Sequence, residues 1–155
     1  MKRLSIFIAC LAIGLFVAPD VSSQGKVYRS VTNEGLEKIL QGLQLKYEKA
    51  ERKEKEGNSI AFFEFKRGEH TYRLINYGND LWIECTSDKA MKAEDVNRWN
   101  AEAKFSRLVL MKQKDKTTLS LESQLDCLGG VTDVMIRQYL IRFDDEMRKF
   151  VKFAK

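Results

Sequence analysis

The stretch IAFFEFKRGEHTYRLINY, residues 60–77, decides the fold. Aromatic and β-branched residues crowd 60–66, and apolar residues alternate with polar ones over 71–77, which is typical of two β-strands. The KRGE segment at 66–69 lies between them and favours a turn, because glycine adopts backbone angles that other residues avoid. The sequence therefore predicts an antiparallel hairpin at the centre of the chain.

Further strands are predicted after this hairpin. The turn-like YGND at 77–80 leads into LWIEC at 81–85, which extends the hairpin to a three-stranded meander. Residues 107–112 and 117–123 flank a polar turn and predict a second hairpin. Both parts belong to one antiparallel sheet.

The charged stretch at 46–56 alternates positive and negative residues. We expect a solvated loop there, with a weak strand over 45–52 as the alternative. The whole chain has a formal net charge of +5, and no face accumulates the single sign that phosphate binding requires. We therefore expect no nucleic-acid partner.

Three helices are predicted from apolar residues that recur every three or four positions. The first follows Thr32, whose hydroxyl can cap the first helical N–H groups, and it fades near Leu45. The second lies between 89 and 104, and the longest follows a second cap residue, Thr132. We predict an α+β fold in the order α-β-β-β-α-β-β-α, with the antiparallel sheet flanked by the three helices.

The N-terminus has the pattern of a secretory signal peptide. Two basic residues precede an uncharged apolar run over 4–18, and small residues follow at 21–23. The run is about 15 residues, shorter than the roughly 20 that cross a bilayer as a helix. We expect cleavage after Ser23 and a periplasmic or secreted bacterial protein with no membrane span. A retained anchor and a lipoprotein lipidated at Cys10 are the alternatives.

This interpretation divides the chain into three parts. Residues 1–23 are the signal peptide, 24–30 are a polar lead-in, and 31–155 form one α+β domain. The domain has a usual length for a single hydrophobic core.

Residues with catalytic chemistry are scattered. His70 is the single histidine and lies beside a predicted turn, and Asp144, Asp145 and Glu146 are helix neighbours that point in different directions. No serine lies in a nucleophile-elbow motif, and no glycine-rich loop has phosphate-binding spacing. We expect no enzyme, no metal site and no cofactor.

Export leaves two cysteines, Cys85 and Cys127, in a compartment that permits disulfides. They form a disulfide, remain two free or buried thiols, or carry out redox chemistry. Their separation of 42 positions in the sequence argues against redox chemistry, because reactive pairs usually have C-x-x-C spacing.

The most unusual local sequence is VNRWN at 96–100. Helical spacing places Trp99 on the buried stripe, and Asn100 lies close enough to need hydrogen-bond partners on neighbouring backbone. We interpret both as structural anchors. Ligand binding by this tryptophan and its two asparagines is the alternative.

This segment, followed by AKFSRLVL at 103–110 and GGVT at 129–132, resembles the signature of the YbjN family of bacterial proteins. The resemblance implies a fold similar to the chaperones of type III secretion, which often dimerise, and a provisional family role as sensory transduction regulators. It carries over no catalytic residue. Many relatives lack a signal peptide, so a cytosolic regulatory role does not follow here. The signature residues with an implied structural role are Asn97, Trp99, Asn100, Gly129 and Gly130.

We expect a non-enzymatic interaction or regulatory domain of the periplasm or cell envelope. It would hold a protein or peptide partner, a second copy included, on its sheet face or an edge strand. One alternative is a thiol-based redox protein that uses Cys85 and Cys127. The other is a small-ligand sensor with a pocket lined by aromatic side chains that also suit a core, namely Phe63, Phe65, Tyr72, Trp82 and Trp99.

Overall fold

The computed structural model describes residues 25–53, 59–88, 91–113 and 116–155. The predicted signal peptide lies outside these residues. No helix in the described ranges is long and apolar enough to span a membrane. The elements of the described chain are α1 (Asn33–Gly42), β1 (Tyr47–Lys53), β2 (Ser59–Arg67), β3 (His70–Asn76), β4 (Asp80–Ser87), α2 (Ala93–Glu102), β5 (Arg107–Gln113), β6 (Lys116–Asp126) and α3 (Asp133–Phe153).

The strands form one antiparallel sheet in the order β1-β2-β3-β4-β6-β5. Strands β1 and β5 are therefore its two edges. Since side chains alternate along a strand, the paired residues Phe63, Leu74 and Ile83 share one face and are fully buried. The predicted α+β class, meander and second hairpin are confirmed.

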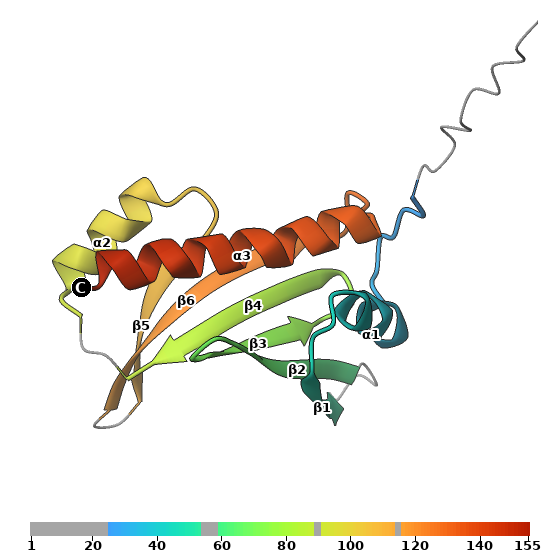
Figure 1. The fold of residues 1–155 in the computed structure, drawn as a ribbon, viewed down its shortest axis with the longest axis horizontal. Helices are drawn as coiled ribbons and strands as arrows, with labels where there is room; N and C mark the ends of the chain where they lie inside the picture. Colours follow the sequence, from blue (N-terminus) through green and yellow to red (C-terminus); the bar gives the residue numbers. More distant parts are fainter. Residues whose placement is uncertain (1–24, 54–58, 89–90, 114–115) are drawn as a thin grey trace, which may run out of the picture.

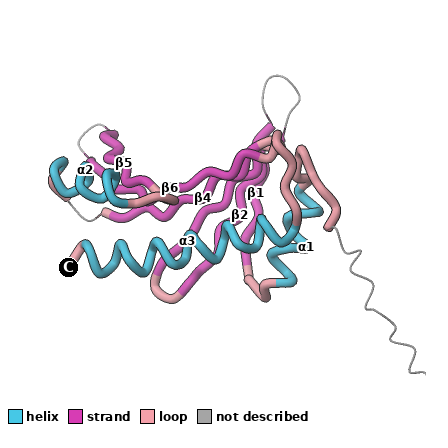
Figure 2. The backbone as a smooth tube through the Cα atoms, turned by 90° about the horizontal axis from the view of Figure 1, so that it is seen from above, coloured by secondary structure: helices cyan, strands magenta, loops and turns pink. Residues whose placement is uncertain are grey.

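The helices cover one face and one end of this sheet. Helix α3 lies across the sheet, with α1 and α2 near opposite ends of the molecule (Figure 1). Seen from above, α1 and α3 lie on the same face, and α2 lies beside β5 (Figure 2). Tyr139 of α3 fixes this layer, because its buried hydroxyl donates to the Ser123 carbonyl at 2.8 Å and lies 3.2 Å from the Leu81 carbonyl oxygen.

Both predicted helix caps are present. The Thr32 hydroxyl accepts from the Gly35 N–H at 3.1 Å, and the Thr132 hydroxyl accepts from the Met135 N–H at 3.3 Å. Each bond satisfies one of the N–H groups that the first helical turn leaves without a partner. The cap residues therefore fix where α1 and α3 begin.

Strand β1 corrects the prediction of a loop within 46–56 and agrees with the alternative of a weak strand over 45–52. Tyr47 packs edge-on against Phe63 with ring centroids 5.5 Å apart, and Lys49 makes a 2.8 Å ion pair with Glu37 of α1. Every residue of β1 has a partner in β2. Pairing with an apolar neighbour and contacts to a helix outweigh the weak strand preference of a charged segment.

The lead-in that precedes α1 contacts the rest of the domain. Tyr28 and Val131 exchange backbone hydrogen bonds of 2.7 and 2.8 Å, and the Val31 N–H donates to the Gly78 carbonyl at 2.8 Å. These bonds tie the start of the described chain to the turn before α3 and to the turn between β3 and β4.

Candidate functional site

The β5 edge is the most apolar exposed backbone of the sheet. Its middle is Leu-Val-Leu-Met at 108–111, in which Leu108 is buried and the other three are half-buried. An apolar strand with one unpaired side offers backbone groups and side chains to another strand. Strand β5 is therefore the candidate partner-binding site.

Asn100 closes one end of this edge. Its side-chain amide donates to the Leu108 carbonyl at 2.9 Å, and its side-chain oxygen accepts from the Leu108 N–H at 2.7 Å. These are the two bonds that a neighbouring strand would make with Leu108. The expectation that Asn100 ties its helix to neighbouring backbone is confirmed.

The Asn100 contact also fixes which way the β5 backbone points. Because N–H and C=O groups alternate sides along an antiparallel strand, Leu110 and Lys112 face the same side as Leu108, away from β6. Within the described chain, no backbone group pairs with this side of β5. The open part of the edge therefore begins immediately after the residue that Asn100 covers.

Trp99 holds α2 in place beside β5. Its ring packs edge-on against Phe150 and Phe153 of α3, with centroid distances of 5.7 and 5.4 Å. The side chain is buried as predicted, and its ring contacts anchor α2 to α3. Its indole N–H has no acceptor among the described residues. Asn97, the other asparagine of the motif, is exposed.

Gly130 forms part of the turn before α3, a role that the family resemblance alone did not specify. Its φ is +93°, a region that residues with a side chain rarely adopt, and an added Cβ would lie 2.7 Å from Val27 Cγ1. Its N–H donates to the Cys127 carbonyl at 2.9 Å. Gly129 has open space around it. Of the two glycines, Gly130 is the one that the turn before α3 requires.

The two cysteines are free and buried, which corrects the disulfide alternative. The Cys127 N–H bonds to the Asn79 carbonyl, and Cys85 lies six residues further along β4. At the rise of an extended strand this separation is about 15–20 Å, well beyond disulfide reach. Burial raises the pKa of each thiol to about 11, which opposes the thiolate that redox chemistry needs.

The acidic residues of α3 make structural contacts. Asp144 accepts a 3.0 Å hydrogen bond from the Tyr72 hydroxyl, Asp145 pairs with Arg148, and Glu146 accepts from the buried Ser106 hydroxyl at 2.8 Å. Arg148 also pairs with Asp144, so Asp144 and Asp145 share one cation, whereas Glu146 faces a different neighbour. Across the described ranges, no three metal-ligating side chains gather into a cluster.

The five aromatic side chains of the ligand-sensor alternative do not share one cavity. Phe63, Phe65, Tyr72 and Trp99 belong to the buried core, whereas Trp82 is half-buried on the opposite face under the Arg107 guanidinium. Two hollows of about 730 and 660 Å³ lie beside β1 and beside α3. Phe65 lines the first of these and Tyr72 the second.

Comparison with known proteins supports this architecture. No protein-family model and no curated protein matches the chain. The crystal structure of YbjN from E. coli superposes with a TM-score of 0.60 over 74% of this chain and 84% of that one. The chain has the fold of YbjN. The two sequences are 13% identical, so the likeness to YbjN concerns the fold alone. YbjN itself is provisionally described as a transcription regulator.

Sequence reasoning singled out Asn100 but missed β5 as an open edge. The sequence feature that could have indicated an open edge is the uncharged Leu-Val-Leu-Met run at 108–111. This strand follows a predicted helix in the sequence and has a predicted strand partner only after it. Nothing in the sequence places β5 outside β6, because that order depends on how the second hairpin docks on β4. The YbjN-like fold supplies this information.

Proposed function

We propose that this chain is a non-enzymatic protein-interaction domain of the periplasm or cell envelope, and that it pairs with a protein partner through β5. The observation that carries the proposal is the apolar edge with Asn100 bonded to Leu108 at one end. The outward backbone groups of Leu110 and Lys112 are the part left for a partner. Strand addition to a sheet edge is a common mode of protein recognition.

A second copy of the chain is the partner that this edge fits best. Because Leu108 is already bonded to Asn100, an antiparallel pair of β5 strands is centred on Met111. Leu110 of each copy then lies opposite Lys112 of the other, which gives about four backbone hydrogen bonds. The two Lys112 side chains lie at diagonal positions about 7–8 Å apart, so these like charges are not directly opposite each other. Both copies keep their helices on the same face of a continuous sheet.

This interface is small. The open part of β5 is short, so the pair lies at the low end of the roughly 1,200–2,000 Å² that stable interfaces bury. We therefore expect a weak, concentration-dependent dimer. Such an edge also accepts an extended segment of another protein by the same bonds.

The signal-peptide pattern at residues 1–23 is the reason for placing this domain outside the cytoplasm. If this is right, N-terminal sequencing of the chain from a periplasmic extract gives a start at Gln24. A full-length chain in the cytoplasmic fraction contradicts the proposed location and leaves the proposed pairing intact.

Sedimentation of the exported chain tests the pairing. We expect the average mass to rise with concentration toward twice that of the monomer. Lys112→Pro removes an N–H that points away from β6 and should keep the chain monomeric without lowering its unfolding free energy. A monomer at all concentrations, or a dimer that Lys112→Pro leaves unchanged, contradicts pairing through β5.

A further inference from the structure

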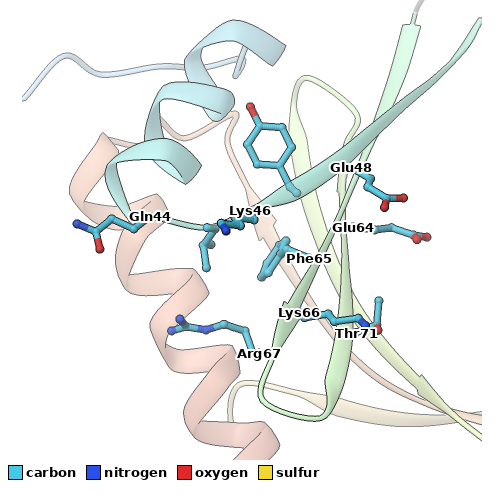
Figure 3. A pocket seen from close by; sticks show the side chains of 10 residues that line it. Gln44, Lys46, Glu48, Glu64, Phe65, Lys66, Arg67 and Thr71 are labelled. Carbon is cyan, nitrogen blue, oxygen red and sulfur yellow. The ribbon is translucent and has the colours of Figure 1, made fainter.

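A groove on the helix-covered side of the molecule runs between the β2–β3 hairpin and the second half of α3. The hollow of about 660 Å³ lies there, with Arg67 and His70 on the hairpin side and Arg148 and Lys152 on the helix side. Arg67 also lines the hollow of about 730 Å³ beside β1. Figure 3 shows Arg67 directed toward α3, whereas Glu48 and Glu64 lie on the other side of the strands. The two hollows therefore meet at Arg67.

The floor of the groove is apolar. Tyr72 and Met147 are buried beneath it, and Val151 is half-buried. A small niche of about 40 Å³ between the two hollows is lined mainly by apolar side chains, among them Leu45 and Ile141. Ile141 of α3 is 41% exposed, so part of its apolar side chain is accessible beside this niche.

The rim of the groove is cationic. Asp144 lines the hollow of about 660 Å³. It already accepts a hydrogen bond from the Tyr72 hydroxyl and pairs with Arg148 at 2.6 Å. Arg67 lies 3.7 Å from the same carboxylate, and Lys152 makes no ion pair with a described residue. The positive side chains of both walls therefore exceed the negative charge available to neutralise them.

Helix α2 holds the helix wall of this groove in position. Trp99 packs on Phe150 and Phe153, which flank the turn that carries Lys152. Arg98 lies over the Phe153 ring at 4.8 Å. The motif that places Asn100 at β5 thus also fixes the last turns of α3 opposite the hairpin.

We propose that this groove binds an acidic, extended peptide segment that carries an apolar side chain. The cationic walls pair with its carboxylates, and the apolar niche beside Ile141 takes its apolar side chain. A flat lipid surface does not enter a groove between a hairpin and a helix. A nucleic acid needs a longer single-sign surface than this short groove, which Asp144 interrupts. This site is separate from the β5 edge and independent of dimer formation.

The test measures fluorescence anisotropy of a short fluorescein-labelled peptide of alternating glutamate and leucine. We expect saturable binding that weakens with added salt, because the contacts are ionic and solvent-exposed. The double variant Arg67→Gln with Lys152→Gln should weaken it by about two- to thirty-fold, as two exposed ion pairs are lost. The control Lys38→Gln with Lys92→Gln removes the same charge from exposed positions outside the groove and should leave binding unchanged.

A second variant separates the apolar contact from charge. Ile141→Ser should weaken peptide binding without changing its salt dependence, and the exposed position leaves the fold intact. Lys112→Pro should have no effect on the peptide, so that failure of β5 pairing and failure of the groove give different results. Equal binding of a lysine–leucine peptide, an equal loss in the control variant, or binding to phosphatidylglycerol vesicles without binding to the peptide overturns the proposal.

Discussion

The two edges of the sheet are strands of equal length with opposite side-chain chemistry. Strand β1 is YEKAERK, and almost every residue in it is exposed and charged, whereas β5 is RLVLMKQ with an uncharged centre. Charged side chains protect an edge because a neighbouring strand would desolvate them without burying apolar area. One sheet therefore has a protected edge and an open one.

The edges also differ in what lies beside them. Lys49 of β1 pairs with Glu37 of α1 at 2.8 Å and with Glu51 at 2.7 Å, so its charge is engaged within the chain. At β5, Asn100 bonds only to Leu108 and leaves the rest of the strand open. Helix α2 therefore determines where the open part of β5 begins, through Asn100, and leaves the rest of the strand accessible to a partner.

The largest effect should come from removing the side chain that holds α2 beside β5. Trp99→Ala leaves a cavity against Phe150 and Phe153 and should lower the unfolding free energy by about 3–5 kcal/mol. Trp82→Ala, on the half-buried opposite face, is the matched control and should cost clearly less. Urea unfolding measures both. Equal losses would mean that Trp99 is not the anchor of α2.

Loss of the Asn100 contact should have the next largest effect. Asn100→Ala leaves the Leu108 N–H and C=O without their partner and should cost about 1–3 kcal/mol. The neighbouring exposed Asn97→Ala should stay within about 0.5 kcal/mol of the wild type. The Asn100 variant should also associate more strongly, since the open edge then includes Leu108. Unchanged stability would contradict the role assigned to Asn100.

The elements that could be predicted are those with local signals. Thr32 and Thr132 marked the helix starts, and the alternation over 60–77 marked the central hairpin. Asn100 was predicted to bond to backbone because an amide near a buried stripe needs partners. These features depend on residues close in sequence.

The rest depends on contacts between distant segments. Strand β1 forms because β2 pairs with it in full register, which its own charged residues do not indicate. The groove joins Arg67 of the hairpin to Lys152 of α3, and the separation of Cys85 from Cys127 follows from the register of β4 against β6. Sequence spacing alone could not provide these distances.

A smaller effect on the unfolding free energy is expected from ionisation of the two buried thiols at alkaline pH. Burial raises the pKa of Cys85 and Cys127 in the folded protein to about 11, from an ordinary value of 9.0. The unfolded chain therefore loses these protons first, and the stabilisation present below about pH 9 is lost as the pH rises toward 11.

Urea unfolding at a series of alkaline pH values checks this effect. The double variant Cys85→Ala with Cys127→Ala should show a shallower fall in unfolding free energy than the wild type over this range. In native protein at neutral pH both thiols should be unreactive, and both should titrate after unfolding without reductant. If neither thiol titrates in the unfolded chain, the two cysteines form a disulfide and the assignment of free thiols is wrong.

Cysteine trapping at the centres of the two edges tests the account most directly. Met111→Cys lies within the open part of β5 and Ala50→Cys lies in the middle of β1. Both positions are on the same face of the sheet, and the native thiols are buried. In the pair centred on Met111 the two new Cα atoms are about 4.5 Å apart, within disulfide reach. We predict a disulfide-linked dimer for Met111→Cys under mild oxidation, and none for Ala50→Cys or for Val109→Cys, whose copies lie about 13 Å apart. Equal crosslinking at both edges, or none at Met111, would contradict the claim that β5 is the open edge.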